Sequence, residues 1–192
     1  MKKLESSLTN MVVVLVAAAL LMGGVLAYIN ELTKDTIAAQ AEKNLTDGIT
    51  LVMGGGQLNV TSTDTVKQTI KGKETAFVVH HVANAGKSLG AAVESITQGF
   101  GGDLKVLVGF DPEGNILGYT VLTSTETPGL GAKADKWFQK DGKGCVIGKN
   151  PSKKPLTVRK DGGEIDAITA STITSRAFLS AINHAYEAYM KK

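Results

Sequence analysis

The stretch LKVLVGFDPEGNILGYTVLTST, residues 104–125, consists of two apolar runs separated by the segment DPEGN. Both runs are rich in β-branched and aromatic residues, which favour strands. The proline, glycine, aspartate and asparagine between them favour a tight turn. We therefore predict a β-hairpin here, and its apolar side chains need other elements to cover them.

The segments around this hairpin predict the other elements of one domain. Residues 75–83 and 89–97 have the composition of two more strands. A short helix is expected around residues 134–139, and one more strand with a tight turn within residues 153–166. A last helix is expected over about residues 175–191, because apolar side chains recur three and four positions apart: Phe178, Ala181, Ile182, Ala185, Tyr186 and Tyr189. Strands first and a helix last favour the α+β class.

The stretch at residues 11–29 is 19 residues long and has no charged side chain. As a helix it would be about 28 Å long, close to the ~30 Å hydrocarbon core of a bilayer. A cleaved signal peptide and a buried core helix are the alternatives, but a signal peptide has a shorter apolar run and a small-residue cleavage site. Lys2 and Lys3 precede the stretch, which predicts a single-pass anchor with a cytoplasmic N-terminus and an extracytoplasmic C-terminal domain.

The region after the anchor predicts a stalk and a connection. Residues 30–48 are rich in helix formers, and residues 54–65 are rich in glycine and threonine. We therefore expect a cytoplasmic segment over residues 1–10, a transmembrane helix over residues 11–29, a stalk helix and linker over residues 30–64, and a folded domain over residues 65–192.

Charge and metal-binding residues exclude several classes of function. The net charge is +3, from 21 Lys and Arg against 18 Asp and Glu, and the charges are scattered, so we expect no nucleic-acid partner. Cys145 is the only cysteine. His80 and His81 are adjacent in a predicted strand and should point to opposite faces, and His184 is distant in the sequence. We therefore expect no metal site.

Hydroxyl side chains crowd the segment TASTITS, residues 169–175, just before the predicted last helix. Thr174 or Ser175 is a suitable N-cap for that helix, but a cap needs only one hydroxyl. The additional hydroxyls lie where a helix N-terminus offers free N–H groups and partial positive charge, which suits a phosphate. A hydroxyl-rich β-strand is the alternative interpretation.

The segment from Asp166 to Thr172 resembles the flavinylation motif of FMN-binding domains in ion-translocating redox complexes. The resemblance implies that FMN is joined through its phosphate to the Thr172 oxygen, and that a flavin transferase reads Asp166 during maturation. The chain departs from the motif at Ala170, where glycine is common, and at Ser171, where alanine is common. Glycine reaches positive φ more easily than alanine, so Ala170 bears on recognition by the transferase.

The segment TETPGLGAK, residues 125–133, resembles a second motif of the same family. The resemblance implies that Gly129 and Gly131 let the backbone approach the flavin, that Leu130 packs on the ring, and that Lys133 makes polar contacts with its edge. Together the two motifs imply the following cofactor-binding residues: Glu126, Thr127, Gly129, Leu130, Gly131, Lys133, Thr169, Ala170, Ser171, Ile173, Thr174 and Ser175. Trp137 is expected as a core or interface anchor, and Arg176 as either a phosphate partner or a solvated residue.

The likeness covers most of the chain and is nearest to the G subunits of Rnf complexes, the ion-translocating ferredoxin:NAD oxidoreductases. It implies an electron-carrying subunit that is not catalytic by itself, with other membrane and redox subunits of the complex as partners. The C subunit of the sodium-translocating NADH:quinone reductase is the alternative family. A membrane-anchored flavin-binding sensor, or a structural module, is an alternative of another class.

Overall fold

The computed structural model describes residues 7–56, 58–70, 72–84 and 86–190. The predicted cytoplasmic flank with Lys2 and Lys3, and the end of the predicted last helix at Lys191, lie outside these residues. The described helices and strands, in chain order, are α1 (Leu8–Val52), β1 (Asn59–Ile70), β2 (Lys73–Asn84), β3 (Lys87–Gln98), β4 (Asp103–Phe110), β5 (Ile116–Ser124), η1 (Gly131–Lys133), α2 (Ala134–Trp137), η2 (Arg159–Asp161) and α3 (Thr172–Met190).

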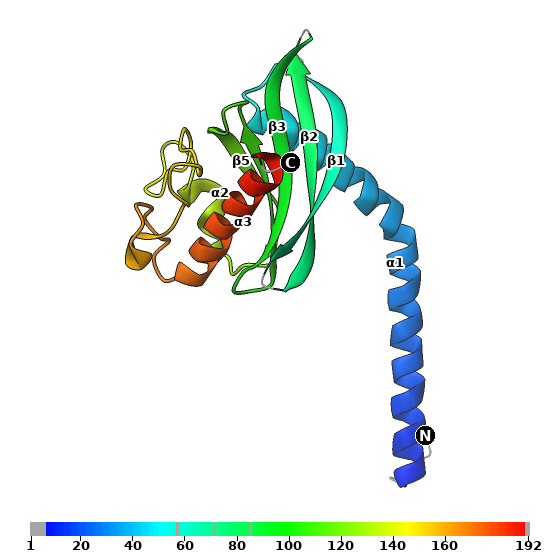
Figure 1. Cartoon of the computed structure of the whole chain (residues 1–192). Helices are drawn as coiled ribbons and strands as arrows, with labels where there is room; N and C mark the ends of the chain where they lie inside the picture. Colours follow the sequence, from blue (N-terminus) through cyan, green and yellow to red (C-terminus); the bar gives the residue numbers. More distant parts are fainter. Residues whose placement is uncertain (1–6, 57, 71, 85, 191–192) are drawn as a thin grey trace. The chain divides into compact units, whose positions relative to one another are not determined.

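The five strands form one antiparallel sheet in the order β1-β2-β3-β4-β5, so each strand pairs with its neighbour in the chain (Figure 1). The predicted hairpin is confirmed as β4 and β5, with Phe110 opposite Ile116 beside the turn. In this turn the Asp111 carboxylate accepts hydrogen bonds from the backbone and side-chain N–H groups of Asn115, each at 2.7 Å. The predicted strands at residues 75–83 and 89–97 are confirmed within β2 and β3. The α+β class is therefore correct.

One face of the sheet is covered by α3. Phe178, Ala181, Ile182 and Ala185 of the predicted apolar stripe are fully buried, while the two stripe tyrosines near the end of α3 are half-buried and pack against the same core. Burying one large apolar side chain contributes roughly 1.5–3 kcal/mol, so this face supplies much of the driving force for folding. The domain core lies between α3 and the sheet.

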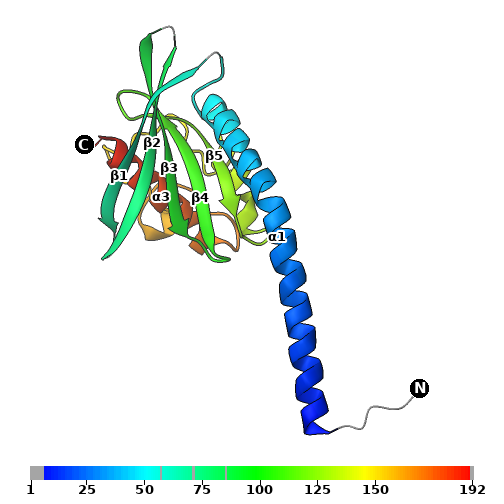
Figure 2. The ribbon, with the colours of Figure 1, turned by 90° about the vertical axis from the view of Figure 1, so that its right-hand side faces the viewer.

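The other face of the sheet is covered by the last turns of α1, and Figure 2 shows this face of the strands. Ile49 and Val52 pack there against apolar residues of β2, β3 and β4. A stalk helix ending at Gly48 was predicted, and this end is wrong: the helix continues to Val52. A Cβ on Gly48 would lie only 3.1 Å from Leu107 Cδ2, so the glycine permits close packing instead of ending the helix. Gly54, at φ +92°, follows the true end.

The N-terminal part of the chain, up to Lys43, is a compact unit of its own, and Asn44 begins the second unit. In the first unit, α1 contains the predicted membrane stretch and stalk as one continuous helix. It is the one helix in the described chain that is long and apolar enough to cross a membrane, and its most apolar window has no buried residue. An exposed apolar surface of this length fits a membrane anchor.

Two secondary-structure predictions are wrong. The expected linker at residues 54–65 ends early, because β1 begins at Asn59 and runs antiparallel to β2. From Thr63 to Ile70 exposed and partly buried residues alternate, which is a strand pattern that glycine and threonine content obscured. The strand expected within residues 153–166 is only one isolated bridge between Val158 and Ile165, since the η2 turn follows Val158 directly.

His80 and His81 point to opposite faces of β2, as predicted. His80 Nε2 lies 2.9 Å from Glu94 Oε1 on the α1 side, and His81 contacts the Tyr189 ring of α3. Burial alone would raise the pKa of Glu94, but hydrogen bonds and charge from His80 and Lys105 outweigh this effect and lower it. The two histidines therefore take part in structural hydrogen bonds of the sheet.

Candidate functional site

The hydroxyl-rich segment forms the start of α3. The helix begins at Thr172, three residues before its predicted start, and Ser171 O accepts the first helical hydrogen bond from Ser175 N–H at 3.0 Å. The Ser175 hydroxyl also donates to Ser171 O and accepts from Ile168 N–H, both at 2.9 Å. The predicted cap at Thr174 or Ser175 and the alternative β-strand are therefore wrong, because both residues lie within the first helical turn.

Ala170 is the only described residue other than glycine with a positive φ, at +60°. This left-handed conformation costs an L-residue with a side chain roughly 1–2 kcal/mol. The turn it makes directs Ser171 N–H to Ile168 O at 3.0 Å and leads into the first residue of α3. Ala170, where the sequence departs from the motif, therefore has a backbone conformation that favours glycine.

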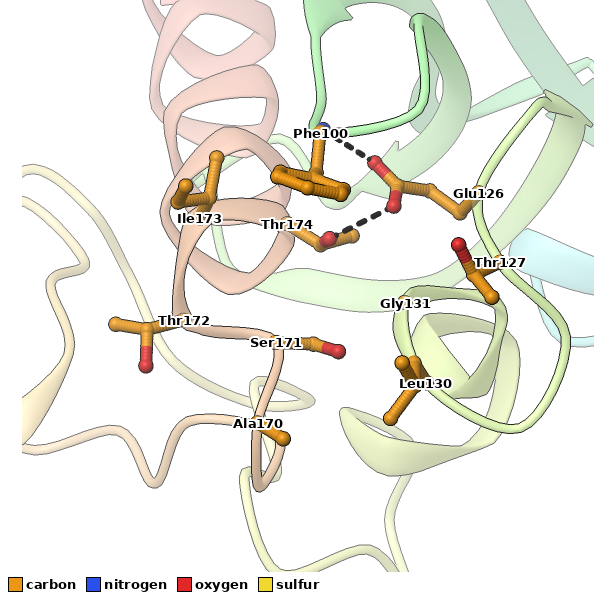
Figure 3. A pocket seen from close by; sticks show the side chains of 10 residues that line it. All are labelled: Phe100, Glu126, Thr127, Leu130, Gly131, Ala170, Ser171, Thr172, Ile173 and Thr174. Carbon is orange, nitrogen blue, oxygen red and sulfur yellow. Dashed lines mark hydrogen bonds between the residues drawn. The ribbon is translucent and has the colours of Figure 1, made fainter.

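A pocket of about 310 Å³ lies between the start of α3, the segment after β5 and the turn between β3 and β4 (Figure 3). Its rim is apolar: Phe100, Ile173 and Leu130 are 70%, 52% and 42% exposed. Thr172 is half-buried and lies across the pocket from Thr127 in Figure 3. The residues that line the pocket are Phe100, Glu126, Thr127, Leu130, Gly131, Ala170, Ser171, Thr172, Ile173 and Thr174.

The Glu126 carboxylate joins the three segments that build this pocket. Oε1 accepts a hydrogen bond from Phe100 N–H at 2.6 Å and a weaker one from Gly101 N–H at 3.4 Å. Oε2 accepts a hydrogen bond from the Thr174 hydroxyl at 2.9 Å. The dashed lines in Figure 3 show the contacts to Phe100 and Thr174. One buried side chain thus fixes the turn after β3, the segment after β5 and the first turn of α3.

Two glycines make room for this carboxylate. A Cβ on Gly99 would lie 2.1 Å from Glu126 Oε1, and a Cβ on Gly131 would lie 2.3 Å from Oε2. Such distances are far below van der Waals contact, so neither position accepts a side chain without movement. Gly131 was predicted to let the backbone approach a flavin, which stays a prediction; the structure shows that it lets the backbone approach Glu126.

Five of the predicted site residues do not line the pocket. Gly129, Lys133 and Thr169 are exposed outside it, and Ser175 is buried behind it. Asp166 does not line the pocket either, and it forms an ion pair: Arg159 Nε lies 2.7 Å from its Oδ1. Their roles toward a cofactor or a transferase remain predictions.

Trp137 packs as expected, while Arg176 is exposed and pairs with a carboxylate. The Trp137 ring packs against the core, and its Nε1–H donates to Asp166 O at 2.8 Å. Arg176 forms two hydrogen bonds of 2.7 Å with Asp161, which raise the pKa of the guanidinium and, with its charge, lower that of the carboxyl. Neither residue lines the pocket.

Phe100 was missed by the sequence analysis. It lies in the glycine-rich segment QGFGG, residues 98–102. A large aromatic residue within a glycine-rich turn was the signal available, since such a side chain has no local core to enter. Its backbone is fixed by Glu126 while its ring remains exposed at the pocket rim.

Comparisons with known proteins agree with this arrangement. The FMN-binding domain family matches residues 99–187, and the RnfG N-terminal region matches residues 1–50. The G subunit of the ion-translocating oxidoreductase complex of Shewanella baltica is 32% identical over 176 residues, covering 87% of this chain and 82% of that protein. Its counterpart from Vibrio vulnificus is 35% identical over 173 residues, covering 85% and 81%.

The chain belongs to the family of G subunits of ion-translocating oxidoreductase complexes. The predicted resemblance is therefore confirmed. The pocket residues from Phe100 to Thr174 all lie within the part matched by the FMN-binding domain, which makes this pocket the candidate flavin site of this G-subunit family member.

A solved structure shows the same fold. The C subunit of the Na⁺-translocating NADH-quinone reductase from Parabacteroides distasonis superposes with a TM-score of 0.56 over 82% of this chain and 95% of that one. The sequence identity is 20%, so this likeness concerns the fold alone.

Proposed function

We propose that this chain is the electron-carrying subunit of an Rnf-type ion-translocating ferredoxin:NAD oxidoreductase, with FMN joined by a phosphoester to Thr172. The observation that carries the proposal is the position of Thr172: it is the first residue of a long helix and lines a pocket within the FMN-binding domain. Membership of the G-subunit family supports the role in an ion-translocating complex.

The residues present suit both ends of FMN. At the phosphate end, the first N–H groups of α3 have no helical partner and carry partial positive charge, which favours a phosphate on Thr172. At the ring end, Phe100, Leu130 and Ile173 offer exposed apolar surface to a flat aromatic group. These two features face one cavity, so a cofactor tethered at Thr172 can place its ring between apolar side chains.

Bound FMN would supply the electron-accepting and electron-donating chemistry, and the protein would supply attachment, orientation and shielding. In this proposal Thr172 Oγ1 holds the phosphate and prevents loss of the cofactor outside the cell. Leu130 and Ile173 restrict where the ring lies. Glu126 keeps the pocket walls together through Phe100 and Thr174. Asp166 presents the attachment segment to a flavin transferase during maturation.

The proposed location is the cytoplasmic membrane, with α1 as its single span and the flavin domain on the extracytoplasmic side. The other membrane and redox subunits of the complex are its electron-transfer partners. The match of residues 1–50 to the RnfG N-terminal region favours this assignment over a C subunit of the sodium-translocating reductase, whose structural likeness reports only the fold. A solitary flavin-binding sensor would not copurify with polytopic redox subunits.

The Thr172→Val variant tests the attachment directly. The full-length chain is produced with a flavin transferase, denatured and separated on a gel, and its flavin fluorescence is recorded. We expect the wild-type band to fluoresce and the Thr172→Val band to be dark, because no oxygen remains to carry the phosphate. The matched control is Thr65→Val, which removes an exposed hydroxyl on β1, outside both motifs and the pocket, and should stay fluorescent. Retained fluorescence in Thr172→Val would exclude this attachment site.

A further inference from the structure

The Glu126 side chain is an unusual component of an apolar-rimmed pocket. It lines the pocket and is only 7% exposed. All of its hydrogen-bond partners are donors: two backbone N–H groups in the turn after β3, and the Thr174 hydroxyl. Three donors therefore face its two oxygens, and a carboxylate can accept a hydrogen bond at each oxygen.

In the part of the chain that the structure describes, this carboxylate forms no ion pair. The described ion pairs join Lys, Arg or His side chains to other carboxylates, and none of them includes Glu126. Buried charges in proteins are usually paired, because removing a charge from water is costly. Here three hydrogen-bond donors face the carboxylate, and no described cation does. The carboxylate therefore lies at the wall of the pocket without a described counter-ion.

We propose that the Glu126 carboxylate lowers the reduction potential of FMN bound in this pocket, in addition to positioning Phe100 and Thr174. The inference rests on the proposed function, since it requires FMN in the pocket. Two electrons and one proton convert FMN to FMNH⁻, so reduction by a partner redox subunit places one additional negative charge next to Glu126. Two like charges in a poorly hydrated pocket repel each other, which disfavours the reduced state.

The neighbouring residues hold this charge in place. Gly99 and Gly131 let their backbones lie close to the two carboxylate oxygens, and Thr174 fixes the carboxylate to the helix that begins at Thr172. Replacement by Gln preserves the size of the side chain and removes its charge. The Gln amide oxygen can still accept one of the hydrogen bonds, so Glu126→Gln separates charge from packing better than a truncation does.

The test measures FMN content and midpoint potential in the full-length protein produced with a flavin transferase. The potential is titrated with dithionite as the reductant and dyes as mediators. We expect Glu126→Gln to retain covalent FMN and to favour the reduced state at least tenfold, a positive shift of about 30 mV or more for a two-electron couple. Glu126→Asp keeps the charge, so its potential should remain nearer the wild-type value.

The matched control is Glu113→Gln, which removes an exposed negative charge in the turn at the opposite end of β4 and β5. Its potential should equal that of the wild type. Equal potentials in loaded Glu126→Gln and wild type would overturn the inference and leave the proposed function standing. Failure of both Glu126 variants to take up FMN would also overturn it, since Glu126 would then serve assembly alone. Absence of covalent FMN from the wild type would instead refute the proposed function.

Discussion

At Thr172 the chain passes from a left-handed turn into a long helix, and this change places a hydroxyl at the mouth of an apolar-rimmed pocket. The turn depends on Ala170, whose φ of +60° is unfavourable for a residue with a Cβ. The helix start depends on Ser171 and Ser175, which satisfy local N–H and C=O groups. Among the crowded hydroxyls, those of Thr174 and Ser175 are engaged in hydrogen bonds, and that of Thr172 is the attachment oxygen in the proposed function.

Ala170→Gly should stabilise the domain. Glycine relieves roughly 1–2 kcal/mol of left-handed strain but loses roughly 0.5–1 kcal/mol through the greater freedom of the unfolded chain. We expect a net gain of up to about 1 kcal/mol in the free energy of unfolding, measured by denaturant titration. Ala167→Gly is the control, since Ala167 has an ordinary φ and should lose stability. Lower stability in Ala170→Gly would contradict the strain assigned to this turn.

The local motifs predicted part of the site because they lie on short segments. Leu130 and Gly131 come from one segment, and Ala170 to Thr174 from another, and both line the pocket. Phe100 escaped prediction because its position depends on a hydrogen bond to Glu126, 26 residues away. The hydrogen bonds by which Glu126 joins three segments were not predicted, for the same reason. Contacts between distant segments leave no periodic signal in the sequence.

The end of α1 shows that a glycine at the end of an apolar pattern does not always end the helix. Gly48 predicted a helix end, yet it lies inside the helix where α1 meets the sheet. Two glycines of the sheet also lie close to this end of α1. A Cβ on Gly109 would lie 2.5 Å from Val52 O, and a Cβ on Gly118 would lie 2.9 Å from it. Strands β2 to β5 were predicted from their composition and turn residues, and the apolar stripe of α3 from its regular period. Close backbone approach has no such period.

Gly109→Ala should therefore destabilise the domain by about 1–3 kcal/mol, the usual cost of forcing a methyl group into filled space. The last turn of α1 must move away from β4, which also weakens the packing of Ile49 and Val52. Thermal unfolding of the full-length chain in detergent measures the effect. Gly24→Ala is the control, because no atom lies within 4 Å of the added Cβ, and it should leave domain unfolding unchanged. An unaltered transition in Gly109→Ala would disprove the close contact.

At the scale of the whole molecule, the proposed function requires one membrane helix with the flavin domain outside the cytoplasm. The apolar part of α1 provides the span, and its side chains are exposed in the described chain. The proposed orientation rests on the lysines before the span in the sequence, by the positive-inside tendency. A tether at Thr172 is useful there, because a dissociating cofactor would be lost from an extracytoplasmic domain.

Single cysteines test this orientation. In a Cys145→Ser background, which removes the only native thiol, Lys160→Cys places a thiol on the exposed η2 turn and Ser7→Cys places one before the span. A membrane-impermeant maleimide added to intact spheroplasts should label Lys160→Cys and leave Ser7→Cys unlabelled. After lysis both should react, which controls for thiol accessibility. The reverse pattern in spheroplasts would place the flavin domain in the cytoplasm.

The central claim is the covalent bond at Thr172, and peptide mass spectrometry of the wild-type protein from its native membrane tests it most directly. The proteolytic peptide containing Thr172 should carry the mass of one FMN less one water. Fragmentation should place this mass on Thr172 and leave Thr169, Ser171, Thr174 and Ser175 unmodified. An unmodified peptide, or a flavin located on another of these hydroxyls, would contradict the account.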